Sequence, residues 1–369
     1  MAALDSIPIL VTGACGQVGI AIIQLLQAQC PTAEIHAVDL NIPAPTSPRY
    51  VPNITYHCGD VTDVENVGIL MRSVRPTVVF HTAGLIPQVA ERLGCNDWEG
   101  FEKVNVGGTK IVLEQCKKVG SVKSFVYTSS CDVVKAGNWT DLRGVDEGQP
   151  IPTRWNDPYS KSKAMAESFV LSSSTPVLPT TAIRTHGVFS AYDNNMLPWL
   201  LSAPRNIHLG SGKNLYDYTY APNLALGHML AAINLLTIHP ADTSNIHSAA
   251  GKPFFITNAE PCHFRVFLTA VWKAYDADLP ERKDIGRGTT IPKNVALPLV
   301  WMNEKVSKIS GKKPLLTTKD LGDSTAERFF DNTRAREVLG YQPSIKLADA
   351  IEEAVRGYKI VVKQEGESR

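Results

Sequence analysis

The chain has 369 residues, of which 44% are hydrophobic, so it can bury a core large enough for two domains or for one domain with a substantial lobe. Its 37 Lys and Arg residues are balanced by 36 Asp and Glu residues, which argues against nucleic acid as a partner. Its seven cysteines form no CxxC pair, which argues against a disulfide framework and a zinc site and favours a reducing, cytoplasmic compartment.

Two short apolar runs are candidates for a targeting or membrane segment. Residues 7–11 lack a basic leader and are too short for the core of a signal peptide, so we interpret them as a strand. Residues 295–302 contain Pro298 and fall far short of the ~20 residues that a membrane span needs. We therefore expect no transmembrane span, and for residues 295–302 buried packing, with peripheral contact to the endoplasmic reticulum as the alternative.

The first 184 residues alternate short β-branched runs with segments of helical periodicity, which is typical of a parallel sheet with crossover helices. The predicted strands are 7–11, 34–40, 55–58, 77–81, 124–128 and 180–184. The predicted helices between them are 18–26, 64–74, 101–119 and 159–170. This order predicts an α/β fold with a doubly wound parallel sheet.

After residue 184 the sequence has more prolines, tryptophans and irregular loops, before a closing helix predicted at 344–358. We interpret this part as a smaller, C-terminal substrate-binding lobe. The predicted division is a dinucleotide-binding domain of residues 1–184, to which 214–257 return, a lobe of 185–213 and 258–361, and a disordered tail of 362–369.

A glycine-rich motif lies between the first predicted strand and the first predicted helix. Glycines at this point let the backbone approach a pyrophosphate, whose charge the amide N–H groups and the helix dipole stabilise. The residues of the motif that we expect to hold a dinucleotide are Gly13, Cys15, Gly16, Gln17, Val18 and Gly19. Because a strand precedes the motif and a helix follows it, the pattern predicts a Rossmann-type cofactor site.

Asp39, at the end of the second predicted strand, favours NAD as the cofactor. A carboxylate there can accept hydrogen bonds from the ribose hydroxyls and would repel the 2′-phosphate of NADP. A solubilising charge at a strand end is the alternative. Asp60 and Val61 follow the third strand and suit the adenine edge, although Asp60 could equally be the N-cap of the helix at residue 64.

Tyr159 and Lys163 form the candidate catalytic pair. Among the eleven tyrosines only Tyr159 has a lysine four residues later, and one helical turn puts both on one face. A nearby ammonium, and the positive charge of a nicotinamide, favour the ionised form of a phenol whose reference pKa is ~10. The phenolate can accept the proton of a hydroxyl while hydride passes to the nicotinamide, so no metal is required.

Three hydroxyl residues, Thr128, Ser129 and Ser130, follow the fifth predicted strand, at the edge where ligands bind in such sheets. One of them should hydrogen-bond the substrate oxygen. Polar capping of the strand is the alternative for this cluster, as is a half-buried helix aromatic for Tyr159. The joint arrangement favours a catalytic site.

Several motifs together carry a family resemblance over nearly the whole chain. They are the glycine motif, His81-Thr82-Ala83-Gly84, Asn105-Val106-Gly107-Gly108-Thr109, Tyr127-Thr128-Ser129-Ser130, and Tyr159 with Lys163. These motifs resemble the extended short-chain dehydrogenase/reductase family. Residues 210–220 with 223–228 look like its 3β-hydroxysteroid dehydrogenase branch, and 251–261 are similar to sterol-4α-carboxylate 3-dehydrogenases.

The resemblance implies roles for individual residues. Ser130 would be the catalytic hydroxyl, with Ser129 as the fallback, Tyr159 the base and Lys163 its electrostatic partner. The further cofactor contacts that it implies are Thr82, Ala83, Gly84, Asn105 and Thr128. The implied reaction oxidises a 3β-hydroxyl to a ketone on a sterol, triterpenoid or meroterpenoid, and a carboxyl on the neighbouring carbon can then leave as carbon dioxide. The resemblance also implies a homodimer.

Two departures from the family pattern affect the substrate loop. The usual Arg-Pro is Arg184-Thr185 here, and the usual aromatic-glycine step is Phe189-Ser190. The loop and the substrate can therefore differ from those of the family.

Three rival functions remain. A nucleotide-sugar epimerase or dehydratase shares the fold. In those enzymes an arginine precedes the aspartate equivalent to Asp217 and clamps a diphosphate, whereas this chain has Tyr216 at that position. A steroid dehydrogenase/isomerase would require a further acid/base group, which we do not identify. A non-catalytic cofactor-binding protein is disfavoured because Tyr159, Lys163 and Ser130 are intact.

Apolar and aromatic residues on loops after strands are candidate substrate contacts, for which core packing is the alternative. Together with Ser130, these candidates are Ile86, Pro87, Thr185, Met196, Trp199 and Tyr216. His186 receives no catalytic role, because a lone histidine after a strand more often hydrogen-bonds to the backbone. The sequence thus predicts a bulky, mostly apolar small-molecule substrate.

Overall fold

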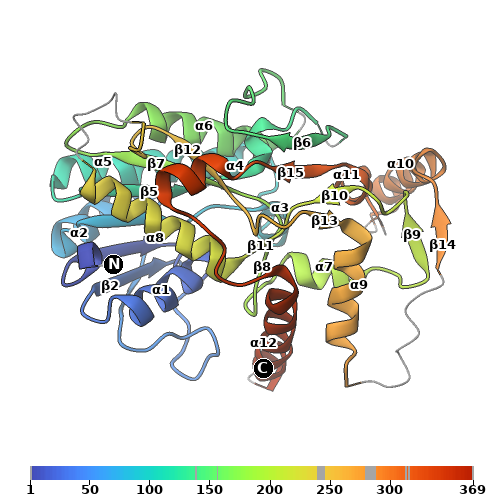
Figure 1. Ribbon diagram of the computed structural model, residues 1–369, viewed down its shortest axis with the longest axis horizontal. Coiled ribbons are helices and arrows are strands. Elements are labelled where there is room, and N and C mark those ends of the chain that lie inside the picture. Colours follow the sequence, from blue (N-terminus) through green and yellow to red (C-terminus); the bar gives the residue numbers. More distant parts are fainter. Residues whose placement is uncertain are drawn as a thin grey trace.

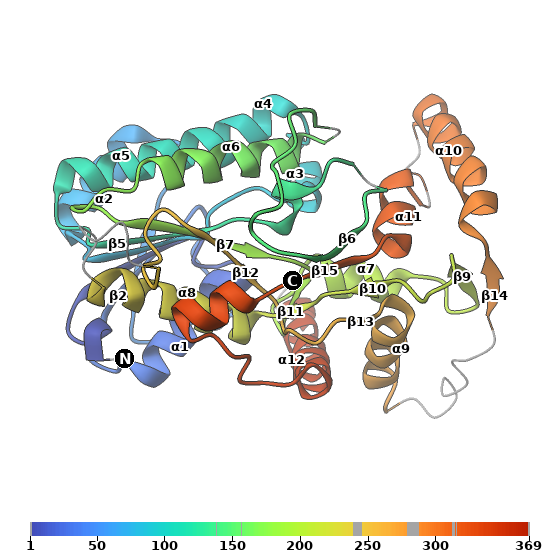
Figure 2. The ribbon, with the colours of Figure 1, turned by 45° about the horizontal axis from the view of Figure 1, so that its top comes forward.

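The computed structural model describes most of the chain. The described residues are 2–137, 139–155, 157–238, 246–278, 288–311, 314 and 316–367. Figures 1 and 2 show a large sheet covered by helices at one end of the molecule and a smaller lobe at the other.

A seven-stranded sheet forms the centre of the larger part, and all its neighbouring strands are parallel. Across the sheet the strands are β12 (Pro253–Ile256), β7 (Thr180–Thr185), β5 (Ser124–Thr128), β4 (Val78–His81), β1 (Pro8–Thr12), β2 (Glu34–Asp39) and β3 (Thr55–Cys58). The chain winds outward in both directions from β1, so the carboxyl ends of β1 and β4 border the switch point where such sheets bind ligands. The predicted doubly wound fold and its six strands are confirmed, whereas β12 was missed.

Helices cover both faces of this sheet because its strands are apolar on both sides. Ile9 and Val11 of β1 pack in one cluster with α1 (Gln17–Gln29) and α8 (Ala221–Thr237). Leu10 packs in the opposite cluster with α2 (Val64–Val74), α5 (Thr109–Val119) and α6 (Pro158–Ser172). The alternation along one strand thus joins the two layers of helices into a three-layer fold.

The helix predicted over residues 101–119 is divided in the structure. α4 (Trp98–Phe101) follows α3 (Pro87–Arg92) and leads into a π-helical segment, Glu102–Gly108, before α5 begins at Thr109. The wider turn contains Asn105, whose side chain is buried and hydrogen-bonded to the loop after β4.

The smaller lobe is built around a second sheet and short paired strands. The second sheet has the order β13 (Cys262–His263), β10 (Leu215–Tyr216), β15 (Arg328–Phe330) and β6 (Leu142–Val145), and the pairs are β8 (Val188–Phe189) with β11 (Thr219–Tyr220) and β9 (Ile207–Leu209) with β14 (Thr289–Ile291). Its helices are α7 (Met196–Ser202), α9 (Phe264–Tyr275), α10 (Lys293–Ser310), α11 (Thr318–Thr325) and α12 (Leu347–Glu367). β6 thus joins this lobe, although it lies within the stretch expected to form the dinucleotide domain.

Two expectations for the C-terminal part are wrong. Residues 362–367 are not a disordered tail but the end of α12, where Arg49 Nε lies 2.7 Å from Glu365 Oε1 and Val361 is buried. Residues 295–302 are not wholly buried, because only Ala296 and Val300 of this stretch of α10 face the core. None of the helices within the described ranges has the length and hydropathy to span a membrane.

Candidate active site

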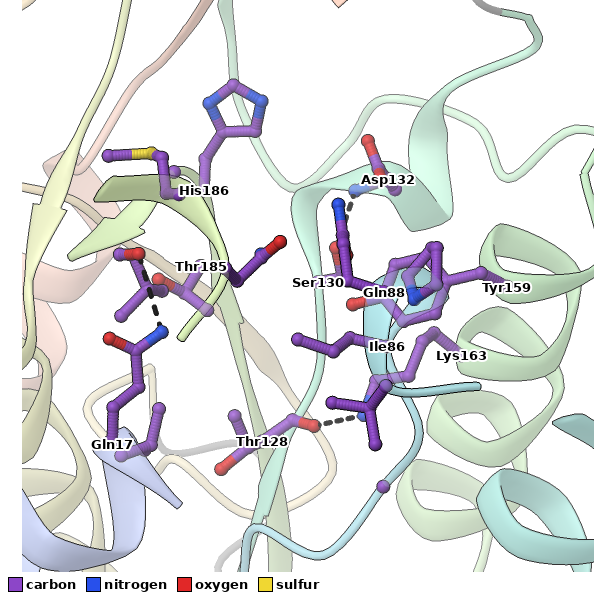
Figure 3. Close-up of a pocket in the computed structure, with 18 of the residues that line it drawn as sticks. Gln17, Ile86, Gln88, Thr128, Ser130, Asp132, Tyr159, Lys163, Thr185 and His186 are labelled. Atoms are coloured by element: carbon purple, nitrogen blue, oxygen red, sulfur yellow. Dashed lines mark hydrogen bonds between the residues drawn. The ribbon is translucent and has the colours of Figure 1, made fainter. Parts of the chain in front are cut away.

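A cavity of about 350 Å³, called the cleft below, opens between the carboxyl edge of the large sheet and the lobe. Figure 3 shows Tyr159 and Ser130 on one side of it, with Gln17 and Thr185 opposite. The residues predicted to hold a cofactor that line the cleft are Gly13, Gly16, Gln17, Val18, Gly19, Thr82, Gly84, Thr128, Tyr159 and Lys163. The structure therefore brings the glycine turn and the predicted catalytic residues together.

The glycine turn leaves no space for side chains at two of its glycines. Gly13 has a φ of +66°, and a Cβ added to it would lie 2.6 Å from the backbone N of Ala83. A Cβ on Gly19 would lie 2.4 Å from the carbonyl oxygen of Gly13. Gly16 is the N-cap of α1, and no side chain in the described ranges caps it, so the amides that begin α1 can bind an anion. This cradle fits the pyrophosphate of a dinucleotide.

Asp39 lies beside this turn rather than in the cleft. Its Oδ2 accepts a hydrogen bond of 2.9 Å from the backbone N of Cys15, and its Oδ1 accepts one of 2.8 Å from Leu40. Burial and the Asp39 carboxylate raise the pKa of the Cys15 thiol to about 12, so the thiol stays protonated. Asp39 thus fixes the turn and ends β2 at the position expected for a ribose contact.

Asp60 and Val61 line a small separate pocket with residues of β1, β2 and α2. Asp60 Oδ1 accepts a hydrogen bond of 2.8 Å from Thr62 N. The N-cap of α2 is Asp63, which accepts hydrogen bonds from Glu65 N and Asn66 N. The alternative interpretation of Asp60 as this N-cap is therefore wrong.

The loop after β4 is held by buried side chains. Thr82 Oγ1 donates to the carbonyl of Thr12 over 2.7 Å. Asn105 Oδ1 accepts from Leu85 N at 2.6 Å, and its Nδ2 donates to Leu85 O and to Ser162 Oγ. Ala83 and Asn105 do not line the cleft. Asn105 instead ties the loop carrying Gly84 to α6.

Tyr159 and Ser130 lie near each other on one side of the cleft (Figure 3). α6 begins at Pro158, with Asp157 Oδ1 accepting from Ser160 N, and this start presents Tyr159 to the cavity. Burial raises the pKa of the Tyr159 phenol above its usual value, and Asp132 raises it further. The nearby Ser130 hydroxyl lowers the pKa of Tyr159 again. Both hydroxyls line the cleft, so both can reach the oxygen of a substrate that enters it.

Lys163 lies one turn further along α6, and its ammonium hydrogen-bonds to a backbone carbonyl instead of the phenol. Its Nζ donates to the carbonyl of Thr128 over 2.5 Å and lies 4.3 Å from the centre of the Tyr127 ring. Burial lowers the pKa of Lys163 to about 7, an effect that Glu167 opposes. The cation that lowers the pKa of Tyr159 is Lys319, which the sequence reasoning missed. Lys163 thus differs from the expected position beside the phenol.

The other two hydroxyls of the triplet point away from Tyr159. Ser129 Oγ donates to Glu167 Oε2 over 2.6 Å, and the Glu167 carboxylate also pairs with Arg184 in the core. Thr128 Oγ1 hydrogen-bonds to Nε2 of His228 at 2.7 Å. Ser130 is therefore the hydroxyl of the triplet that is available to a substrate.

All the predicted substrate contacts line the cleft, although Tyr216, Met196 and Trp199 also pack in a hydrophobic cluster of the lobe. They are Ser130, Ile86, Pro87, Thr185, Met196, Trp199 and Tyr216. His186 also lines it, with Nδ1 donating to the carbonyl of Asp217 over 3.0 Å, and burial lowers its pKa to about 4. The expected backbone hydrogen bond of this histidine is thereby confirmed.

A charged network on the wall of the cleft was not foreseen. Lys135 Nζ lies 3.1 Å from Asp132 Oδ1, and Asp323 pairs with Lys319 at 2.7 Å and with Arg328 at 3.2 Å. Asp132, Lys319, Asp323 and Arg328 line the cleft. The only signal in the sequence was the position of Asp132, two residues after Ser130, since the others come from distant parts of the chain.

No group of three or more His, Cys, Asp or Glu side chains suited to a metal ion occurs in the part of the chain that the structure describes. The charged network is instead composed of carboxylates paired with lysines and an arginine.

Comparison with known proteins gives consistent matches over most of the chain. The model of the 3-beta hydroxysteroid dehydrogenase/isomerase family matches residues 10–286. The chain is 32% identical, over 95% of its length and 97% of the relative, to sterol-4-alpha-carboxylate 3-dehydrogenase ERG26, decarboxylating, of Saccharomyces cerevisiae. It is 31% identical to the sterol-4-alpha-carboxylate 3-dehydrogenase, decarboxylating, of Homo sapiens, over 84% of this chain and 78% of the relative.

Solved structures share the fold at lower identity. An epimerase of Methanothermobacter thermautotrophicus has a TM-score of 0.69 at 20% identity, covering 99% of this chain and 96% of its own. A short-chain dehydrogenase/reductase superfamily protein of Agrobacterium tumefaciens, solved with bound NAD, has a TM-score of 0.66 at 19% identity and covers 97% of this chain and 99% of its own. These likenesses show that the chain has a Rossmann fold.

Proposed function

Because the chain belongs to the 3-beta hydroxysteroid dehydrogenase/isomerase family, we propose that it oxidises the 3β-hydroxyl of a sterol, triterpenoid or meroterpenoid to a ketone, with NAD as the cofactor. The observation that carries this proposal is that Tyr159 and Ser130 line the same cleft as the glycine turn. The chain is an oxidoreductase that acts on a hydroxyl group.

The residues that would hold the dinucleotide lie mainly within residues 1–184. The amides at the start of α1 would bind the pyrophosphate, and Asp39 would accept hydrogen bonds from the ribose and disfavour a 2′-phosphate. Thr82 and Gly84 border the path towards Tyr159. When bound, NAD supplies a hydride acceptor and a positive charge next to the phenol.

The chemistry of the protein itself is transfer of the hydroxyl proton. Ser130 holds the substrate oxygen by a hydrogen bond, and Tyr159 accepts the proton once its phenol is ionised. Lys319 favours the ionised phenol through its charge, whereas burial and Asp132 oppose it. Lys163 fixes the end of β5 through the Thr128 carbonyl and so positions Ser130 two residues later.

A carboxyl on the carbon next to the hydroxyl would be lost after oxidation. The ketone formed from such a substrate is a β-keto acid, which releases carbon dioxide without a further redox step. The names of the yeast and human relatives, both described as decarboxylating, support this extension. We therefore include 4-carboxylated substrates in the proposal.

An epimerase that acts on nucleotide sugars fits the cleft less well. Tyr216 stands among aromatic neighbours, with ring centres 4.4 Å from His186 and 5.6 Å from Phe264. Arg328, the guanidinium nearest to it on the cleft wall, already pairs with Asp323. The aromatic surroundings of Tyr216 and the pairing of Arg328 with Asp323 favour a polycyclic alcohol over a diphosphate.

The test is turnover by the purified full chain with NAD or NADP, followed through the absorbance of the reduced cofactor. We expect oxidation of 3β-hydroxy sterols or terpenoids, with NAD preferred, and mass spectrometry of products from 4-carboxylated substrates should show the loss of carbon dioxide. Turnover of a nucleotide sugar with none of any sterol or terpenoid would overturn the proposal, and preference for NADP would overturn the role of Asp39.

We also propose that the protein is cytoplasmic and touches the surface of the endoplasmic reticulum through α10. Side chains on the outer side of this helix are apolar and exposed, among them Trp301 at 56% and Met302 at 55%. Lys305 Nζ lies 5.4 Å from the centre of the Trp301 ring, so positive charge accompanies the apolar surface. This combination suits the boundary between lipid headgroups and acyl chains.

A homodimer remains part of the proposal on the basis of the family resemblance. Molar mass from light scattering on purified protein tests it directly, since a monomer of 40.3 kDa would contradict it.

A further inference from the structure

A second cavity, of about 530 Å³, lies under α10 in the lobe. Its walls are mainly aliphatic side chains from β9, α9, β14 and α10, including Ile207, Leu209, Leu268, Ile291, Ala296 and Val300. Figures 1 and 2 show these elements at the end of the molecule remote from α2 and α5. Ile207 and Leu299 line the cavity and are 41% and 53% exposed, so the cavity reaches the surface of the protein.

The second cavity is separate from the cleft. Trp199 and Phe264 line both spaces, and their rings pack edge to face with centres 6.1 Å apart. None of the residues assigned above to proton transfer lines the second cavity. A molecule in the second cavity therefore enters from the surface, and its binding does not depend on the proposed function.

The second cavity contains an arginine without a carboxylate partner. Arg265, the second residue of α9, lines the cavity and donates from Nη2 to the carbonyl of Gly210 over 3.2 Å. The chain packs closely on the guanidinium, because a Cβ on Gly212 would lie 2.5 Å from Arg265 Nε. Within the described ranges no carboxylate forms an ion pair with Arg265. Its other N–H groups are therefore available to an anion.

His208 adds a second polar group beside Arg265. It lines the same cavity, and burial together with the charge of Arg265 lowers the pKa of its imidazole. A neutral imidazole has one N–H group, which can donate to an anion held by Arg265. The carboxylate that lines the cavity, that of Asp320, accepts hydrogen bonds from Thr317 N and Oγ1 and caps α11. Asp320 thus has its own partners in the wall shared with the cleft.

The rest of the lining suits an aliphatic chain. Trp199 and Phe264 already pack against each other, and the other apolar residues of the lining are aliphatic. A flexible chain adapts to such a space and is removed from water by entering it. The volume of the cavity lies within the ~300 to ~1,000 Å³ of pockets that bury one small molecule. An aliphatic molecule with one anionic end therefore matches both parts of the lining.

We propose that the second cavity binds a single-chain fatty acid, with its carboxylate at Arg265 and His208 and its aliphatic tail between α9 and α10. The planar guanidinium can donate two hydrogen bonds to the two oxygens of a carboxylate. The tail packs against aliphatic side chains such as Leu268 and Val300. The site adds a ligand class, an aliphatic carboxylate, to the proposed function and takes no part in the oxidation.

Calorimetric titration of the full chain, freed of bound lipid, compares three ligands. Each methylene that leaves water contributes roughly a fourfold gain in binding, so decanoate should bind at least about tenfold more tightly than hexanoate. 1-Decanol has the same tail as decanoate without the charge. It should bind about tenfold more weakly than decanoate, because the charge-assisted hydrogen bonds to Arg265 are missing.

Variants on α9 and α10 locate the site. Arg265→Met should weaken decanoate about tenfold and leave 1-decanol unchanged. Val300→Trp places an indole in the second cavity, where Val300 is buried, and should weaken both ligands about tenfold or more. Leu299→Trp narrows the cavity from its exposed rim and serves if Val300→Trp fails to fold.

Val266→Trp is the matched control, because it makes the same change in size on α9 at a residue that is 59% exposed and lines neither cavity. It should bind decanoate and 1-decanol as the wild type does.

Three results would overturn the inference. They are no binding of decanoate by the wild type, equal affinities of the wild type for decanoate and 1-decanol, and decanoate binding that survives both α10 variants. A preference for decanoate that persists in Arg265→Met would place the carboxylate elsewhere and would also overturn it. Oxidation of alcohols is measured separately and decides the proposed function alone.

Discussion

Tyr159 shows how single residues decide the chemistry of the cleft. Its phenol is buried beside Asp132, and both conditions raise its pKa, while Ser130 and Lys319 lower it. The sequence predicted Tyr159 from the position of its motif after the fifth strand, and the family resemblance selected Ser130 from the three hydroxyl residues. The sequence could not predict the effect of Lys319, because it acts from α11 on a residue of α6 more than a hundred residues away, and no local pattern specifies such an interaction.

Tyr159→Phe should lower kcat/KM by two or more decades, because the variant lacks the group that accepts the proton. The affinity for NAD, measured by calorimetry, should stay within about twofold of wild type. In the wild type, kcat/KM should rise with pH above neutrality, since burial raises the pKa of the phenol and only its ionised form accepts a proton. Retained activity in the variant would contradict the role of Tyr159.

Ser130→Ala should lower activity, whereas Ser129→Ala should lower stability. Ser130 faces the phenol, so its loss should reduce kcat/KM by about 10–100-fold with little change in stability. Ser129 donates to the buried Glu167, so its loss should reduce the free energy of unfolding by about 1–3 kcal/mol. Denaturant titration and initial rates on both variants check this pair, and equal loss of activity in both would contradict the assignment of Ser130.

Asp217→Asn should change how stability depends on pH. Asp217 is fully buried, accepts from Phe330 N, and has a pKa raised by burial to about 7. The folded carboxyl therefore keeps its proton between about pH 4 and 7 while the unfolded one releases it, so the wild type loses stability as pH rises through this window.

Asp217→Asn removes this loss. The free energy of unfolding of the variant should therefore exceed that of the wild type by about 2–4 kcal/mol between pH 4 and 7. Urea titrations at a series of pH values measure the difference. A pH-independent difference between the two proteins would contradict the raised pKa.

At the scale of elements, the regular parts of the large sheet were predictable and its last strand was not. β1 to β5 and β7 follow from β-branched runs that alternate with helical segments. β12 has only four residues, Pro253–Ile256, and begins with a proline, so its run of strand-forming residues is too short to predict a strand with its place in the sheet. It becomes a strand because it pairs with β7. In α10, the apolar run at 295–302 was expected to be buried, but the helix packs through one side only.

The turn from β1 to α1 needs glycine at position 13 both for its positive φ and for the close approach of Ala83. A matched pair of variants separates these two reasons. Gly13 and Gly120 have φ values of +66° and +69°, so alanine is strained at both. A Cβ at Gly13 meets the backbone of Ala83, whereas one at Gly120 meets no atom of the described chain within 4 Å. Gly120→Ala should cost about 1 kcal/mol of stability and leave NAD binding unchanged.

Gly13→Ala should cost more stability and weaken NAD binding by at least about tenfold, because the turn must move away from the pyrophosphate. Thermal unfolding and calorimetric titration with NAD compare the two variants. Equal behaviour of both would show that the close approach to Ala83 is unimportant.

At the scale of the whole molecule, α10 lies at the end remote from α2 and α5 (Figures 1 and 2). If α10 touches lipid, the purified protein should float with vesicles that contain anionic lipid, and Trp301→Asp should reduce the floated fraction by about fivefold or more. Val177→Asp, at another exposed residue far from α10 in the sequence, is the control and should float like wild type. Equal flotation of the two variants would contradict membrane contact through α10.

The pairing of β6 with β15 brings residues 142–145 against residues 328–330. A ribosome must therefore release nearly the entire polypeptide before the wall carrying Arg328 can close over the hydroxyls after β5. Nascent chains that stop before β15 would expose the unpaired edge of β6 and would lack one wall of the cleft. Such species bind chaperones and aggregate. For this reason the two halves should be insoluble when they are expressed separately from a split gene. When the halves are co-expressed, β6 and β15 can pair with each other.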